Sequence, residues 1–121
     1  MKQIKISDAE LVLMEHIWEN EGIRAAQLVQ KGKEEMGWSR NTTYTLLTRM
    51  MEKELIRRED PGFCCSAQIT KDQVRAGQTH SLIDRLYAGS RQMFLASFLK
   101  SEKISVEDLE EIRRMIEEEG R

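Results

Sequence analysis

Apolar residues recur along this chain at intervals of three and four positions, the spacing that places them on one face of an α-helix. Capping residues mark where such helices begin, and glycines mark where some of them end. The pattern predicts five helical segments, which begin after Ser7, near Ala25, after Ser39, after Thr70 and after Ser105. The fourth segment is expected to reach about residue 100, with Gly77 and Gly89 as points where it can bend or break.

Between the third and fourth segments the pattern changes from helical to strand-like. Residues 56–59 and 63–69 have strand propensity, and Asp60-Pro61-Gly62 between them has turn chemistry. The sequence therefore predicts a β-hairpin after three helices, which is the element order of a winged helix-turn-helix. In that fold the third helix enters the DNA major groove and the hairpin, or wing, lies along the DNA backbone.

Helical spacing also predicts which residues of the three helices are buried. An advance of 100° per residue places four residues of the third helix on one face, which can pack on the first two helices. The four are Thr43, Leu46, Leu47 and Met50. Leu55 is expected to close the end of this apolar contact. In the second helix the candidates for burial are Ala26, Leu28, Val29 and Met36, and in the first they are Leu11, Met14, Ile17 and Trp18.

The opposite face of the third helix carries the chemistry of a DNA-reading surface. Asn41, Tyr44, Thr45 and Thr48 lie together there, although Thr and Asn are mediocre helix formers. Asn can pair bidentately with adenine, and Thr can bond a base edge or touch a thymine methyl. The alternative is an ordinary Ser/Thr-rich N-cap followed by solvated polar residues.

Local charge favours the DNA-reading interpretation over the alternative. The whole chain has a net charge of −2, but residues 38–58 carry five basic and two acidic residues, a net charge of +3. Residues 107–121 carry seven acidic and three basic residues, a net charge of −4. Phosphate contact requires only a locally positive surface. The candidate DNA-contacting residues are Ser39, Arg40, Asn41, Thr42, Tyr44, Thr45, Thr48, Arg49, Arg57 and Arg58.

Within this set we expect different roles for different side chains. Asn41, Tyr44 and Thr45 are expected to set the sequence preference. The four arginines are expected mainly to contact phosphates.

Other chemistries have no clear pattern in the sequence. The carboxylates lie on amphipathic helices without a histidine or serine partner pattern, and His16 and His80 are isolated. Glycine-rich phosphate loops and cofactor motifs are absent, so we expect neither an enzyme nor a cofactor. The adjacent Cys64 and Cys65 are poorly placed for a mutual disulfide, and two thiols do not complete a zinc site. They are expected to face opposite sides of a strand, a redox or metal switch being the less favoured alternative.

Membrane segments are also absent from the pattern. The longest uninterrupted apolar stretch is Phe94-Leu95-Ala96, far short of the ~20 residues of a membrane span, and no signal peptide is recognisable. We therefore expect a cytoplasmic protein that does not bind membranes directly.

The 121 residues suit one domain with an appendage, or two very small units. We expect a DNA-binding domain over residues 1–70 and a two-helix dimerisation domain over residues 71–121, so the fold class is mainly α. Two helices of this length cannot enclose a core alone. The apolar residues expected to be buried between two copies are Ile83, Leu86, Tyr87, Phe94, Leu95, Phe98, Leu109, Ile112 and Ile116.

Three stretches carry a resemblance to a known family. They are ISDAELVLMEHIW (6–18), WSRNTTYTLLTRMMEKELIRRE (38–59) and LIDRLYAGSRQMFLASFLKSEKISVEDLEEIRRMI (82–116). In order and spacing they resemble the penicillinase-repressor family of the BlaI, MecI and CopY type. The resemblance implies a homodimeric winged-helix repressor that binds a dyad-symmetric operator. In penicillinase-type members, a membrane sensor metalloprotease triggers cleavage in the dimerisation region when a β-lactam arrives.

The chain departs from the family pattern at three places. Copper-responsive members carry a cysteine-rich metal hook where this chain reads MIEEEGR, so copper sensing of that type is disfavoured. Penicillinase-type members are cut at an Asn-Phe bond, and the matching pair here is Ser97-Phe98. Tyr44 stands where relatives often carry a basic residue, so the operator sequence cannot be inherited from them. A protein-interaction adaptor, or a repressor of this fold that answers another signal, is the alternative function.

Overall fold

The first helix begins at its capping residues. In the computed structural model, which describes residues 4–120, α1 spans Asp8–Glu19. The Ser7 hydroxyl accepts a hydrogen bond from the backbone N–H of Glu10 at 3.1 Å, and the Glu10 carboxylate accepts one from the backbone N–H of Ser7 at 2.8 Å. This reciprocal pair satisfies two N–H groups that the start of a helix otherwise leaves without partners.

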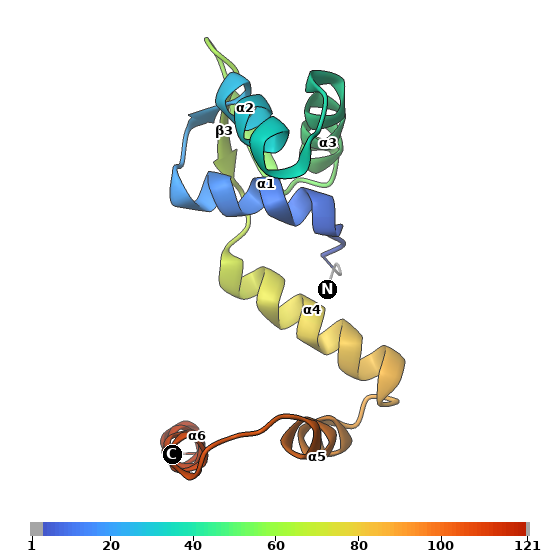
Figure 1. Cartoon of the computed structure of the whole chain (residues 1–121), viewed down its shortest axis with the longest axis vertical. Coiled ribbons are helices and arrows are strands. Elements are labelled where there is room, and N and C mark those ends of the chain that lie inside the picture. Colours follow the sequence, from blue (N-terminus) through green and yellow to red (C-terminus); the bar gives the residue numbers. More distant parts are fainter. Residues whose placement is uncertain (1–3, 121) are drawn as a thin grey trace. The chain divides into compact units, whose positions relative to one another are not determined.

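Helices α2 (Ala25–Met36) and α3 (Arg40–Glu52) follow at the predicted positions. Gly37 ends α2 with φ of 70°, a left-handed conformation that favours glycine because it has no Cβ. Ser39 then caps α3, and Figure 1 shows α1, α2 and α3 arranged as neighbours in the N-terminal part of the chain.

A three-stranded antiparallel sheet completes this part of the fold. Strands β2 (Ile56–Glu59) and β3 (Cys64–Ala67) form the predicted hairpin, which we call the wing. The third strand, β1 (Ile23–Arg24), pairs with the other side of β3, which gives the order β1-β3-β2. A strand of two residues is too short to show alternation, so sequence reasoning missed it.

The core lies where the helices meet the sheet. Leu13, Met14, Ile17, Leu28 and Leu47 are fully buried. The predicted inner face of α3 is confirmed, since Thr43, Leu46, Leu47 and Met50 are all buried and Leu55 closes the end of the core.

The prediction for α2 was wrong at two residues. Ala26 and Met36 are exposed, whereas Ala25 and Leu28 are buried. The inner face of α2 therefore begins one residue earlier than predicted, and Met36 belongs to the last turn, where the helix leaves the core.

The C-terminal region contains three helices, which corrects the two-helix prediction. They are α4 (Lys71–Leu86), α5 (Arg91–Ser101) and α6 (Val106–Glu119). Gly77 lies inside α4 without ending it, but Ala88 and Gly89 both have positive φ and break the predicted long helix. Ser90 then caps α5, so one continuous apolar pattern is divided between two helices.

The chain divides into two compact units, residues 1–78 and 79–121. Helix α4 therefore begins in the first unit and ends in the second. Its start is the predicted Thr70 capping box, in which the Gln73 carboxamide accepts a hydrogen bond from Thr70 N and the Thr70 hydroxyl accepts one from Gln73 N. The predicted division of function between residues 70 and 71 stays a prediction.

A buried carboxylate joins the first helix to the end of the third. Glu10 is 1% exposed, and its Oε1 accepts a hydrogen bond from Lys53 Nζ at 2.6 Å. Burial tends to raise the pKa of the Glu10 carboxyl, but the hydrogen bonds from Lys53 and Ser7 outweigh this and hold that pKa below its ordinary value. The ionised carboxylate therefore stabilises the folded state.

We expect the stability of the fold to depend on the ionisation of Glu10. Because the folded pKa lies below the ordinary value of 4.5, the stabilisation is complete above that pH and is lost as the pH falls through the folded pKa. Glu10→Gln should lower the free energy of unfolding at neutral pH by about 1–3 kcal/mol and should flatten the loss of stability in acid. Urea unfolding at a series of pH values measures both effects.

Glu19→Gln is the matched control, because Glu19 is an exposed residue at the end of the same helix. If both variants show the same acid profile as the wild type, Glu10 does not have this role.

Candidate nucleic-acid interface

Helices α2 and α3 approach each other closely at one glycine. A Cβ atom at Gly32 would lie 2.9 Å from the Thr43 hydroxyl and 3.0 Å from Cε3 of Trp38. Contacts this short require a neighbour to move, so a side chain at this position would push α3 away from α2. Gly32 weakens the helix in isolation, but its small size sets the distance between the two helices of the helix-turn-helix.

The outer face of α3 presents polar side chains that are not engaged elsewhere. Asn41, Thr45 and Arg49 are exposed, and their side chains make no hydrogen bond or ion pair with any other residue in the range 4–120. Thr48 is exposed too, but its hydroxyl donates a hydrogen bond to the backbone carbonyl of Tyr44 at 3.0 Å. Asn41 and Thr45 are thus the side chains on this face whose donors and acceptors are most available.

The predicted contacts at the start of α3 have a second use within the protein. The Ser39 hydroxyl accepts a hydrogen bond from the backbone N–H of Thr42 at 3.2 Å and lies 3.0 Å from the Thr42 hydroxyl. Both hydroxyls therefore serve the N-cap, as the alternative interpretation expected. A helix N-terminus can still bind a phosphate through its backbone N–H groups, so the predicted DNA contacts of Ser39 and Thr42 stay predictions.

The wing arginines are paired with acids of the wing itself. Arg57 lies 2.7 Å from the Glu59 carboxylate, and Arg58 Nε donates to both oxygens of Asp60 at 3.0 and 3.2 Å. The hydrogen bond from Arg58 lowers the pKa of Asp60. Residues 38–60 carry five basic and four acidic residues, so the net charge of +3 falls to +1 when the whole of β2 and the turn is counted.

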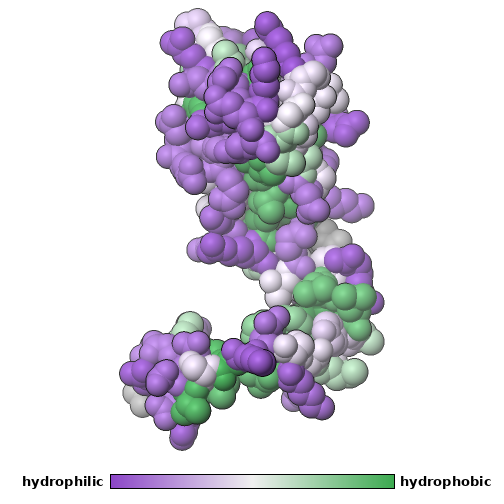
Figure 2. Space-filling model, in the orientation of Figure 1, coloured by the Kyte–Doolittle hydropathy of each residue, from purple (hydrophilic) through white to green (hydrophobic). Residues whose placement is uncertain are grey.

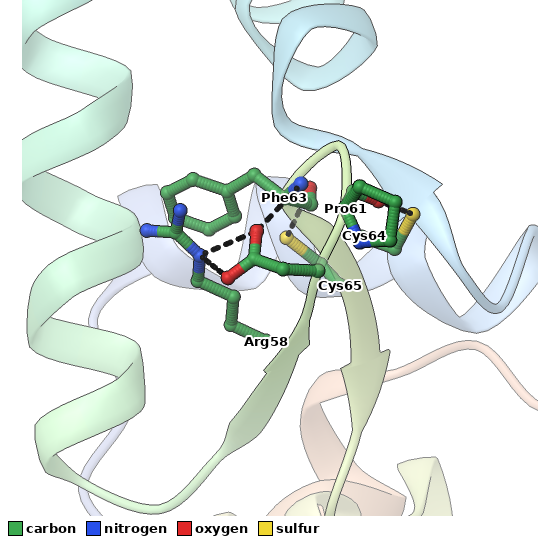
Figure 3. A network of polar contacts seen from close by, with 6 residues as sticks. Arg58, Pro61, Phe63, Cys64 and Cys65 are labelled. Atoms are coloured by element: carbon green, nitrogen blue, oxygen red, sulfur yellow. Dashed lines mark hydrogen bonds and ion pairs between the residues drawn. The ribbon is translucent and has the colours of Figure 1, made fainter.

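Two aromatic rings connect the wing to α3. The Phe63 ring lies 5.7 Å from the ring of Tyr44, at an interplanar angle of 62°. Figure 3 shows the Arg58 guanidinium against the face of the Phe63 ring. It lies 3.8 Å from the centre of that ring, and the Arg40 guanidinium lies 5.3 Å from the centre of the Tyr44 ring. Tyr44 is half-buried, so it differs from its exposed neighbours on the predicted reading face.

Sequence reasoning missed Phe63 as a residue of this interface. It follows the turn directly, where its aromatic side chain suggested only a strand residue. Because its partner Tyr44 lies on another element, only the fold places the two rings together. One pattern in the sequence could have indicated this role. Phe63 and Arg58 lie on either side of the predicted turn, so the aromatic ring can pack against the guanidinium group.

The two cysteines lie on opposite sides of β3, as predicted. Cys65 is buried and Cys64 is half-buried, and Figure 3 shows their sulfur atoms pointing away from each other. Burial raises the pKa of the Cys65 thiol to about 11, so it stays protonated and unreactive at neutral pH. Within residues 4–120, no cluster of three His, Cys, Asp or Glu side chains could hold a metal ion.

The predicted dimerisation residues are mostly exposed in the single chain. Ile83, Tyr87 and Phe94 are half-buried, and the Tyr87 and Phe94 rings meet edge to face at 5.5 Å. The other six are exposed, namely Leu86, Leu95, Phe98, Leu109, Ile112 and Ile116.

In the part of the chain that the structure describes, no helix is long and apolar enough to cross a membrane.

The three helices and the wing define the class of the N-terminal part as a winged-helix DNA-binding domain. The family model for the penicillinase repressor matches residues 6–118, and the chain belongs to this family.

Three relatives match nearly the whole of this chain. It is 29% identical to the penicillinase repressor of Bacillus licheniformis over 121 aligned residues. The alignment covers 98% of this chain and 94% of that protein. It is 28% identical to the penicillinase repressor of Staphylococcus aureus, over 95% of this chain and 93% of that one. It is 25% identical to the methicillin resistance regulatory protein MecI of Staphylococcus aureus (strain N315), over 95% of both chains.

Two solved structures resemble part of this chain. The DNA-binding domain of the repressor BlaI matches with a TM-score of 0.55 and 28% identity, over 60% of this chain and 90% of that one. The monomeric form of Bacillus licheniformis BlaI, in complex with the blaP half-operator, matches with a TM-score of 0.51, the same identity and the same coverage. The winged-helix prediction is confirmed.

Proposed function

We propose that this chain represses transcription in the cytoplasm as a homodimer bound to a dyad-symmetric operator. The observation that carries the proposal is the outer face of α3, where Asn41, Thr45 and Arg49 are exposed and unengaged by the rest of the described chain. A helix with such a face beside a wing has the arrangement that reads a major groove. The complex of BlaI with the blaP half-operator, at 28% identity, supports operator DNA as the ligand of this domain.

The side chains of this surface divide into two roles. Asn41 and Thr45 have the size and the donors and acceptors that base edges require. Arg40 and Arg49 are exposed cations on the same helix, suited to phosphates. Arg57 and Arg58 reach phosphates only in competition with Glu59 and Asp60, so we expect them to contribute less than their number suggests.

Substitutions on α3 should separate base reading from phosphate contact. Asn41→Ala should cost about 1–3 kcal/mol on the cognate site and little on random DNA. Arg49→Ala should weaken binding to both and flatten the salt dependence, because one fewer counterion is released. Gel-shift and fluorescence-anisotropy titrations with the protein's own upstream region and a random duplex measure these effects.

Lys103→Ala, between α5 and α6, controls for loss of one positive charge elsewhere on the chain. If Asn41→Ala and Arg49→Ala behave identically on both duplexes, the division of roles is wrong. If the wild type does not bind its own upstream region more tightly than the random duplex, the proposed repressor function is wrong and the adaptor function is favoured instead.

Dimerisation is proposed from the apolar surface of the C-terminal helices. Neither α5 nor α6 contains a buried residue in the single chain. On α6, Leu109, Ile112 and Ile116 lie on one face and are 42%, 39% and 64% exposed. Figure 2 shows hydrophobic surface over the C-terminal helices. Each such side chain gains about 1.5–3 kcal/mol when it is fully buried, so a second copy of the chain is the partner that these faces fit.

A charge placed on this face should produce monomers. We expect the double variant Leu109→Glu/Ile112→Glu to sediment as a monomer at micromolar concentration, because the interface would bury two unpaired carboxylates. Glu118→Gln, half a turn away from Leu109 around α6, is the control and should leave the dimer intact. A wild-type monomer in analytical ultracentrifugation would overturn the dimer.

Release from DNA is proposed to proceed by cleavage at Ser97-Phe98, triggered by a membrane sensor metalloprotease. The bond lies inside α5, and the Tyr87 hydroxyl donates a hydrogen bond to the Ser97 hydroxyl at 3.1 Å. Cleavage therefore requires α5 to unwind locally. The cut would remove Phe98 and all of α6 from the dimer interface. Loss of the second half-site removes an effective-concentration gain of roughly 10²–10⁴.

Cells exposed to a β-lactam should accumulate a fragment that ends near residue 97. Ser97→Asn restores the Asn-Phe pair of the penicillinase-type members and should be cut faster than the wild type. Immunoblots taken over time after induction measure the full-length chain and the fragment. Derepression while the repressor stays full length would show that proteolytic induction does not operate here.

A further inference from the structure

Four side chains from α3 and the wing form a row of two aromatic rings with a guanidinium group at each end. Arg40 lies over Tyr44, Tyr44 meets Phe63 edge to face, and Arg58 lies over Phe63. The two inner members are rings and the two outer members are guanidinium groups. We call the Tyr44–Phe63 pair the aromatic bracket.

Hydrogen bonds to the Asp60 carboxylate and to the backbone of α2 hold Phe63 in place on the wing side of the bracket. Asp60 accepts hydrogen bonds both from Arg58 Nε and from the backbone N–H of Phe63, which lies 3.2 Å away, so the turn and the arginine share one carboxylate (Figure 3). The Phe63 carbonyl accepts a hydrogen bond from the backbone N–H of Ala25 at 2.9 Å. Phe63 is thus fixed to the start of α2 as well as to the wing.

The terminal groups of both outer arginines remain available. Arg58 makes its hydrogen bonds to Asp60 through Nε, and its two terminal amino groups make none with any described residue. The Arg40 guanidinium forms neither an ion pair nor a hydrogen bond within residues 4–120. A ring face restrains a guanidinium without neutralising it, whereas a carboxylate does both. Arg40 is therefore ordered in advance without being neutralised, whereas Arg58 is also paired with Asp60 and can bind another anion only through its two terminal amino groups.

We propose that the aromatic bracket is a positioning device for DNA binding, and that Phe63 is its key residue. The bracket fixes the wing tip relative to α3 and holds Arg40 and Arg58 in place for two separate phosphates. Ordering these long side chains before binding lowers the entropy cost of contact. The inference rests on the proposed DNA-binding function and gives Tyr44 a role through its ring rather than its hydroxyl.

Paired substitutions separate the ring from its other properties. Phe63→Leu and Tyr44→Leu keep an apolar side chain but remove the ring, whereas Phe63→Tyr and Tyr44→Phe keep the ring. Met51→Leu is the control, because Met51 is another partly buried residue of α3 packed against the core. Fluorescence anisotropy of the full-length proteins, at several salt concentrations, gives Kd for the upstream region and for a random duplex.

We expect the two leucine variants at the bracket to bind both duplexes about 5- to 10-fold more weakly, with a shallower salt dependence. The ring-retaining variants should stay within about twofold of the wild type, as should Met51→Leu. The double variant Phe63→Leu/Tyr44→Leu should lose little more than either single one, because both remove the same contact.

Two results would overturn the bracket while leaving the repressor intact. One is wild-type affinity and salt slope in Phe63→Leu. The other is an equal loss in Met51→Leu, which would attribute the effect to general destabilisation, with thermal unfolding of each variant measured in parallel. If the wild type itself binds neither duplex, the proposed function fails and the bracket fails with it.

Discussion

The close approach of α2 and α3 at Gly32 is the constraint on which the position of the outer face of α3 depends. Glycine allows Thr43 and Trp38 to pack directly against the backbone of α2. That contact fixes how α3 sits on the helix before it, and therefore which of its faces points outward. A longer side chain would shift the whole of α3, so the identity of one buried residue controls the position of Asn41 and Thr45 on the opposite side.

A second link holds α3 at its other end. Glu10 belongs both to the capping box of α1 and to the ion pair with Lys53, the residue that caps the end of α3. One carboxylate thus joins the start of one helix to the end of another. The apolar core between them, which includes Leu47 and Met50, explains why α3 can begin with mediocre helix formers: packing of its inner face stabilises it more than propensity does.

The wing combines balanced charge with ordered aromatic contacts. Its arginines are paired with Glu59 and Asp60, so strong non-specific attraction to DNA is not its main property. The stack from Arg58 to Phe63 and Tyr44 instead links the wing to α3 through weakly polar contacts. A wing built in this way would contribute to DNA binding mainly by holding its side chains in fixed positions, which favours a defined site. Long-range electrostatic attraction would contribute less.

The local features of the fold could be read from the sequence, whereas its long-range contacts could not. Caps at Ser7 and Ser39, the apolar face of α3 and the hairpin turn depend on residues within a few positions of one another, so periodicity and turn chemistry reveal them. The pairing of β1 with β3, the meeting of Tyr44 with Phe63 and the need for glycine at position 32 depend on residues far apart along the chain. These contacts form only when the elements pack together in the folded protein. No local sequence pattern specifies which distant side chain will face a given residue, so the sequence alone could not reveal them.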